Sequence, residues 1–164
     1  IYFRNLKLKK QMRIFCLCIL FSLLGCDRNR IFEKHIDLKG NWPQKSSHLF
    51  EFDIIDSKIP YQITGMVRNK NSYAFNNLYV KYELFYEDSL IKTDLTEVIL
   101  FEPKTGKPLG TGMGSTFDRN FDFIQSHTFE VSGHYCIKLT QFMRLDTLQD
   151  IDQIGVRVTA IIQP

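Results

Sequence analysis

The sequence predicts an all-β protein, an antiparallel β-sandwich of about 7–8 strands behind an N-terminal lipoprotein signal peptide. Apolar and polar residues alternate with a period of two in most segments after residue 47, as they do in half-buried strands. Turn-forming residues recur about every ten residues, which is typical of sandwiches. No segment keeps apolar residues at helical spacing for three turns. Two packed sheets would bury the apolar faces without a disulfide.

The first segment carries the features of an export signal. Residues 14–24 carry no charge and are apolar except for Ser22, and Gly25-Cys26 follows them. Eleven residues are too few to span a membrane, which takes about 20. A basic stretch, a short apolar core and a small residue before a cleavage point are typical of a secretory signal peptide. Cysteine directly after Leu-Leu-Gly matches the bacterial lipoprotein signal, in which the thiol of this residue, here Cys26, is acylated and becomes the new N-terminus. The basic residues before the core are Arg4, Lys7, Lys9, Lys10 and Arg13.

Cys26 therefore divides the chain. We expect residues 1–25 to be a removed signal peptide, 26–32 a lipidated tether, and 33–164 a single β-sandwich domain. Five of the 21 basic residues lie in the signal segment, which leaves 16 against 18 acidic residues in the rest. A nearly neutral body without a basic run argues against a nucleic-acid partner.

The first half of the predicted domain contains four strands. Residues 33–37 form a short strand, which Asn41-Trp42-Pro43 should end because proline fixes φ and restricts the residue before it. Residues 48–54 place three large apolar side chains on one face. Residues 61–68 form the next strand, with Gly65 as a candidate bulge and a turn cluster at 69–72. Residues 78–86 are rich in aromatic residues, which suit a half-buried pleated surface.

The second half repeats this pattern. Residues 95–101 form a strand, and a Pro-Lys-Thr-Gly turn and a glycine-rich connection follow it. Residues 121–131 alternate only loosely, whereas 135–142 form a clear strand. We expect 145–151 to form one or two helical turns capped by Asp146, and 155–162 to close the chain as a strand.

The sequence contains no pattern of catalytic or metal-binding residues. Beyond Cys26 only Cys136 remains in the body, and we interpret it as a packed strand residue. The four histidines show no metal-ligand spacing, and no nucleophile elbow or phosphate loop is present. We therefore expect no enzyme activity, no cofactor and no metal.

One polar cluster is a candidate partner surface. Gln141, Arg144 and Asp146 follow a buried-type strand, and Trp42 is the only tryptophan of the chain. Arg144 either pairs with a carboxylate and fixes the loop, or contributes to an interface, where arginine and aromatic residues are enriched. Both interpretations stay open for Arg144, and a tryptophan such as Trp42 is more often a core or rim anchor than a platform for a ligand.

The chain resembles the gliding-motility lipoprotein H (GldH) family. Matching blocks run in the family's order over about residues 68–158, and none of them is a catalytic motif. The blocks are Arg68-Asn69, Tyr73-x-x-Asn76-Asn77-Leu78-Tyr79, Asp94-x-x-x-Val98-x-Leu100, Gly106-Lys107-Pro108-Leu109-Gly110-Thr111-Gly112, Gly133-x-Tyr135, Gln141-x-Met143-Arg144-x-Asp146-x-Leu148-x-x-Ile151 and Ile154-Gly155-Val156-Arg157-Val158.

The resemblance implies a lipoprotein of the cell envelope, at the outer membrane, that is required for gliding motility. It carries over one residue, the lipidation site Cys26, which would hold the protein to the membrane. We expect a non-enzymatic assembly component that contacts other motility and secretion proteins of the envelope. The alternative is a glycan- or cell-wall-binding module, because exposed aromatic residues such as Trp42, Tyr73 and Tyr79 could stack on sugar rings.

Overall fold

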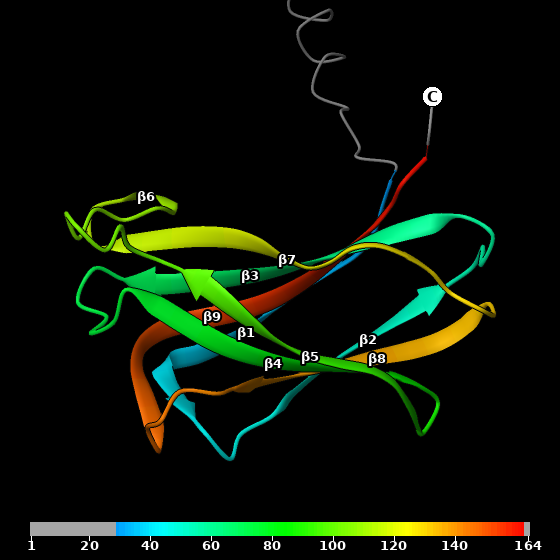
Figure 1. The fold of residues 1–164 in the computed structure, drawn as a ribbon, viewed down its shortest axis with the longest axis horizontal. Coiled ribbons are helices and arrows are strands. Elements are labelled where there is room, and N and C mark those ends of the chain that lie inside the picture. Colours follow the sequence, from blue (N-terminus) through cyan, green and yellow to red (C-terminus); the bar gives the residue numbers. More distant parts are fainter. Residues whose placement is uncertain (1–28, 163–164) are drawn as a thin grey trace, which may run out of the picture.

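The computed structural model describes residues 29–162, which form a two-layered β-sandwich (Figure 1). All strand pairs are antiparallel, and the described residues contain no helix, so the predicted fold class is confirmed. One sheet has the order β1-β9-β3-β7-β6 and the other β2-β8-β4-β5. The strands are β1 (Arg30–Pro43), β2 (His48–Ile54), β3 (Pro60–Lys70), β4 (Asn77–Tyr86), β5 (Ser89–Ile99), β6 (Thr111–Met113), β7 (Thr116–Thr128), β8 (Gly133–Gln141) and β9 (Thr147–Ala160).

Aromatic side chains fill the space between the sheets. Phe129 lies at the centre of one cluster, with ring centroids 4.4 Å from Tyr135, 5.6 Å from Tyr61 and 6.3 Å from Phe52. These residues come from both sheets and from the β7–β8 connection, and all are buried. Burial alternates along β2, β4 and β8, so each strand places a row of large apolar side chains inward, and β8 ends this row with the buried Gln141.

The strand β1 is much longer than the sequence predicted. It pairs with β9 from Arg30 to Pro43, so the expected break at Asn41-Trp42-Pro43 is wrong. Proline is tolerated there because β1 is an edge strand and Pro43 is its last residue. The start of β1 also lies within the segment 26–32 that we predicted as a tether.

The helical turns predicted for residues 145–151 are wrong, since β9 begins at Thr147. Leu148 and Ile151 are both fully buried although they are three residues apart, a spacing that resembles a helix. The cause is a bulge at Asp150, whose φ is 65°. Gly40 of β1 pairs with Ile151 and Asn41 pairs with Gln149, so Asp150 has no partner on β1. A bulge shifts the inward face by one residue and so imitates helical periodicity.

Three smaller differences concern the remaining strands. Gly65 pairs regularly with its neighbours and is no bulge; the ring of Phe121 lies so close that an added Cβ would approach its Cζ to 2.4 Å. The strand β5 begins at Ser89, six residues before the predicted strand, as the second arm of a hairpin. The glycine-rich connection contains the short strand β6.

The predicted signal peptide and its cysteine, Cys26, lie outside the described residues. Among residues 29–162 no helix is long and apolar enough to cross a membrane.

Candidate functional site

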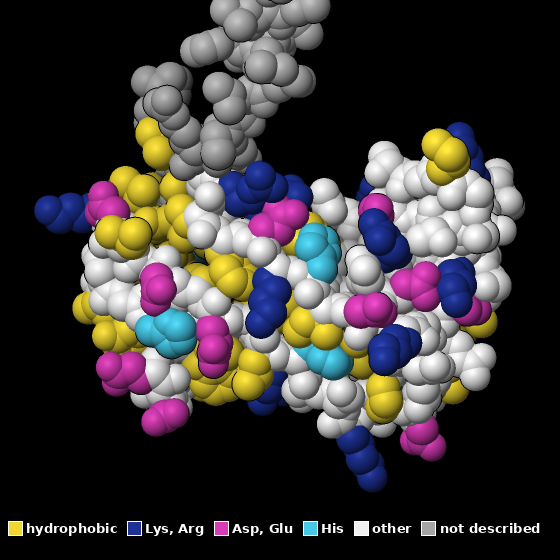
Figure 2. Space-filling view, turned by 180° about the vertical axis from the view of Figure 1, so that it is seen from behind, with side chains coloured by type: hydrophobic (Ala, Val, Ile, Leu, Met, Phe, Trp, Pro, Cys, Tyr) yellow, Lys and Arg dark blue, Asp and Glu magenta, His cyan; other side chains and the backbone are white. Residues whose placement is uncertain are grey.

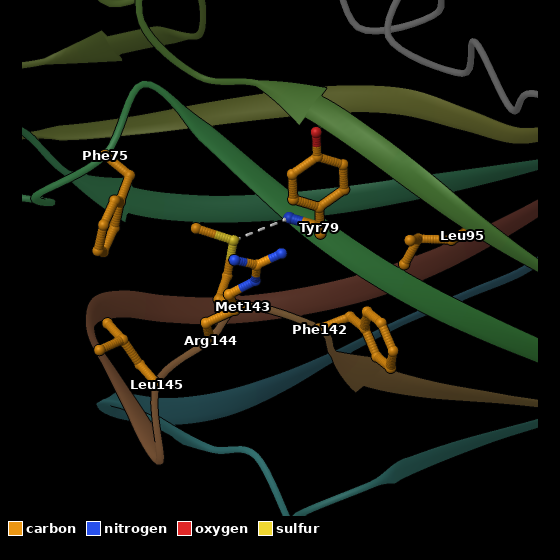
Figure 3. Close-up of a pocket in the computed structure, with 7 residues that line it drawn as sticks. All are labelled: Phe75, Tyr79, Leu95, Phe142, Met143, Arg144 and Leu145. Carbon is orange, nitrogen blue, oxygen red and sulfur yellow. Dashed lines mark hydrogen bonds between the residues drawn. The ribbon is translucent and has the colours of Figure 1, made fainter.

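A groove of about 540 Å³ lies on the outer face of the β2-β8-β4-β5 sheet, at the end where β8 leaves it. We call it the aromatic groove. Six of its seven lining residues are apolar or aromatic, and the seventh is an arginine. In Figure 3, Phe75 and Leu145 lie on one side of Arg144, and Phe142 and Leu95 lie on the other. The lining residues are Phe75, Tyr79, Leu95, Phe142, Met143, Arg144 and Leu145.

The connection between β8 and β9 forms one wall of this groove, and a buried amide shapes it. The Gln141 side chain accepts a hydrogen bond from the Met143 N–H at 2.8 Å and donates one to the Leu145 carbonyl at 3.0 Å. Gln141 is fully buried, and its side-chain amide bonds to two backbone groups of the turn that have no backbone partner there. Gln44 adds two further bonds, from its backbone N–H to the Asp146 carbonyl and from its side chain to the Met143 carbonyl.

The opposite wall is held by β4 and by the connection that precedes it. The Tyr79 N–H donates to the Met143 sulfur at 3.4 Å, and the Phe142 N–H donates to the Tyr79 carbonyl at 2.8 Å, which ties the loop to β4 (Figure 3). The buried Tyr73 phenol donates to the Asn77 carbonyl at 3.1 Å, and burial raises its pKa. Its ring lies 5.7 Å from that of Phe75 and so positions it.

The charges of the groove are unequal. Hydrogen bonding with the Glu97 carboxylate raises the pKa of Tyr79, and Asn77 donates to the same carboxylate at 2.6 Å. Arg144, in the middle of the groove, is exposed and forms no ion pair with any residue of the described range (Figure 3). The groove therefore presents one unpaired guanidinium next to apolar and aromatic carbon.

All four residues of the predicted partner surface lie at this end of the sandwich, but in different roles. Trp42 and Gln141 are each fully buried, so neither can present its side chain to a partner. Trp42 pairs with Leu148 across β1 and β9 and donates its indole N–H to the Ser46 carbonyl at 3.1 Å. Arg144 and Asp146 are exposed, and of these only Arg144 lines the groove. The loop-fixing carboxylate pair considered for Arg144 does not form among the described residues.

Sequence reasoning missed the other groove residues, although a signal was present. In β8 the inward positions end with the polar Gln141, and the next position, Phe142, is an aromatic residue on the polar side. These two departures from the alternation identify Gln141, which supports the loop from inside, and Phe142, which forms an exposed wall of the groove. Phe142 is 53% exposed, and Leu95 on β5 is an outward apolar residue of the same kind at 44%.

The outer face of the other sheet is polar and internally paired. Arg68 donates to both carboxylate oxygens of Asp118, at 2.7 and 2.9 Å. Glu33 accepts bonds from Arg157 and Arg30, each at 2.7 Å, and these bonds, that of Arg157 above all, lower its pKa to about 2. A shallow hollow of about 280 Å³ separates the two sets of pairs.

Cys136 and His134 lie two residues apart on the outward side of β8 but do not form a catalytic pair. Burial raises the pKa of the Cys136 thiol, which makes it a poor nucleophile, and His134 is paired with Asp53 at 2.8 Å on the solvent side. Within residues 29–162 no three histidine, cysteine or carboxylate side chains gather as metal ligands would.

Comparison with known proteins identifies the family. The model of the GldH lipoprotein family matches residues 30–158. A Christiangramia forsetii protein described as a gliding motility lipoprotein GldH homolog is 29% identical over 147 residues, covering 85% of this chain and 88% of its own. The gliding motility lipoprotein GldH of Flavobacterium johnsoniae is 24% identical over 143 residues, covering 83% and 88%.

Similarity to solved structures is weak. A 4-O-methyl-α-glucuronidase of family GH115 matches with a TM-score of 0.45 and 9% identity, over 84% of this chain and 18% of the enzyme. The family assignment rests on the sequence comparison alone, in which the model of the GldH lipoprotein family spans most of the chain. This protein belongs to the GldH lipoprotein family.

Proposed function

We propose that this protein is a lipid-anchored component of the cell envelope that serves gliding motility by docking another envelope protein, without an enzymatic role. The motility assignment is supported by the names of its two relatives, and the anchor by the lipoprotein signal that ends at Cys26. We expect the outer membrane to hold that anchor. Fractionation of the two membranes by density is the direct check on this location.

The observation that carries the docking role is the unpaired Arg144 within the aromatic groove. Soluble domains rarely expose contiguous apolar surface without a binding function, and arginine with aromatic residues is the composition of interface hot spots. A segment of a partner protein with apolar side chains and one carboxylate opposite Arg144 would complement both features. Such a carboxylate would form a two-pronged, charge-assisted hydrogen bond with the guanidinium.

The glycan alternative loses most of its basis. Of the three aromatic residues that could have stacked on sugar rings, Trp42 and Tyr73 are buried. Tyr79 is half-buried, and its phenol already interacts with Glu97.

The test is rescue of spreading in a gliding bacterium whose own copy of the gene has been deleted. We expect the wild-type protein to restore spreading, and the double variant Phe142→Asp with Arg144→Glu to fail. Met113→Asp is the matched control, because Met113 is 93% exposed on β6, outside the groove. Full rescue by a folded, lipidated groove variant would overturn the docking role.

A further inference from the structure

Exposed aliphatic side chains gather at the end of the sandwich where β1 begins. Ile55 is 87% exposed, Ile162 57%, Val131 44% and Ile31 40%. Figure 2 shows hydrophobic side chains at its left end, next to the grey residues; this is the right end of Figure 1, where β2 finishes and the chain enters β1. We call these four residues the anchor-end patch. Isolated apolar residues on a surface are ordinary, whereas several around one point indicate a contact.

Direct contacts hold the segments of this patch together. The rings of Phe32 and Phe52 lie 5.8 Å apart, so the start of β1 lies beside the end of β2. The Ser132 hydroxyl donates to the Ile55 carbonyl at 2.8 Å and joins the β7–β8 connection to the β2–β3 connection. The Ala160 N–H donates to the Asn29 carbonyl at 2.7 Å, so the C-terminal end of β9 lies beside the same entry point.

The length of chain between the anchor and the sheet limits how far this end can be from a membrane. Asn29, whose carbonyl is already bonded to β9, comes only three residues after Cys26. A fully extended chain spans at most about 3.5 Å per residue, so three residues bridge about 10 Å. A lipid on Cys26 would therefore bring the start of β1 to within roughly one headgroup layer of the bilayer.

The charges at this end favour apolar over electrostatic contact. The connections that carry Ile55 and Val131 contain Asp56, Lys58 and Glu130, and Arg30, next to Ile31, is paired with Glu33 at 2.7 Å, so the charges are mixed and do not form a basic patch. A surface that adsorbs to anionic lipid shows clustered lysine or arginine instead. Aliphatic side chains with a mixed-charge rim suit the boundary between headgroups and acyl chains.

We propose that the anchor-end patch lies against the membrane surface, with its aliphatic side chains inserted among the lipid headgroups. The inference rests on the proposed lipidation of Cys26 and adds an orientation to it. The sandwich then stands with its long axis away from the bilayer, and the aromatic groove is at the far end. The 14 residues of β1 separate the two ends, which is roughly 40 Å at the rise of an extended strand.

The experiment uses the full chain, processed and lipidated in a bacterial host and reconstituted into vesicles of phosphatidylethanolamine and phosphatidylglycerol. Ile55→Cys is labelled with an environment-sensitive fluorophore in a Cys136→Ser background, and Met113→Cys is the matched control at the other end of the fold. We expect nitroxide-labelled lipids to quench the probe at position 55 several-fold more than the probe at 113. This difference should persist at high salt, because the contact is apolar.

A second pair of variants tests the patch itself. Val131→Asp with Ile162→Asp should reduce quenching at position 55 towards that at 113, whereas Leu109→Asp, which alters an exposed leucine outside the patch, should leave it unchanged. Mass spectrometry of the N-terminal peptide distinguishes the proposed lipidation of Cys26 from the proposed orientation on the membrane. An unmodified Cys26 would refute the anchor and the orientation that depends on it. A lipidated protein with equal quenching at 55 and 113 would overturn the orientation alone.

Discussion

The outer faces of the two sheets differ in how their arginines are paired. On the β1-β9-β3-β7-β6 sheet, Arg68 and Arg157 each donate to a carboxylate at 2.7 Å. On the other sheet, Arg144 lies among apolar side chains with no ion pair to a described residue. The paired face completes its interactions within the molecule. The proposed docking role would use the exposed guanidinium and the aromatic carbon beside it, with a carboxylate of the partner as the counterpart of Arg144.

The largest effect should come from the buried support of the groove. Gln141→Leu leaves the Met143 N–H and the Leu145 carbonyl without their partners, at a position that is fully buried. We expect the free energy of unfolding to fall by about 1–3 kcal/mol, the cost of one buried unsatisfied group, because the bond to the Met143 N–H is buried and Leu145 is exposed. Urea denaturation measures this. The half-buried neighbour Thr140→Leu is the control, and a change below about 0.5 kcal/mol in Gln141→Leu would show that the loop does not depend on this amide.

The groove wall should affect binding without affecting stability. Phe142 is 53% exposed, so Phe142→Ala should leave the unfolding free energy within about 0.5 kcal/mol. A photo-crosslinking residue at position 145 should capture the partner, and Phe142→Ala should lower its yield about tenfold, the equivalent of about 1.4 kcal/mol. Equal yields from Phe142→Ala and wild type would remove this wall from the interface and weaken the contrast between the two faces.

The paired face should respond to acid. Hydrogen bonds from Arg157 and Arg30 hold the pKa of Glu33 at about 2, well below the 4.5 of a free glutamate side chain. A depressed pKa means that the stabilisation is complete above about pH 4.5 and disappears as the pH falls towards 2. After allowance for solvent screening we expect on the order of 1–2 kcal/mol. Thermal unfolding between pH 6 and 2.5 should show a loss that Glu33→Gln lacks, and parallel curves for the two proteins would refute it.

The smallest effect concerns the Arg68–Asp118 pair. Both side chains are largely solvated, with exposed fractions of 41% and 50%, and exposed ion pairs contribute about 0–1 kcal/mol. Asp118→Asn should therefore lower stability by less than about 1 kcal/mol and leave crosslinking at the groove unchanged. A loss of crosslinking in this variant would show that the polar face also takes part in docking.

The fold could be predicted from the sequence because its strands bury one face. Where alternation is strict, as in 48–54 and 78–86, the predicted strands agree with β2 and β4 to within one residue. The prediction failed where an irregularity of the backbone interrupts the two-residue alternation of buried and exposed side chains. The bulge at Asp150 lets Leu148 and Ile151 face the same side, and alternation alone cannot separate this from a helical turn. The start of β5 was missed because its first seven residues are all exposed, so apolar and polar side chains do not alternate there.

The candidate site could be predicted only in part. The sequence located the region from Gln141 to Asp146, because a polar loop after a buried strand is conspicuous. It could not separate Gln141, which is buried, from Arg144, which is exposed, because that depends on how the loop folds back on the strand. Phe75 and Leu95 reach the groove from segments that lie 47 residues or more away in sequence from Phe142, and only the sheet order brings them together.

The pairing of β1 with β9 has a mechanical consequence. A membrane anchor would pull β1 at its first residue, and a partner in the groove would pull β9 at its first residue, through the loop that precedes Thr147. These two points lie at opposite ends of one antiparallel pair that extends from Arg30–Thr159 to Pro43–Thr147. Tension between membrane and partner would therefore load the hydrogen bonds of this ladder in shear, all together, and would not open them one after another. A ladder loaded in shear resists a pull better than one that is peeled open, so the pairing of β1 with β9 suits a domain held between a membrane anchor and the proposed partner.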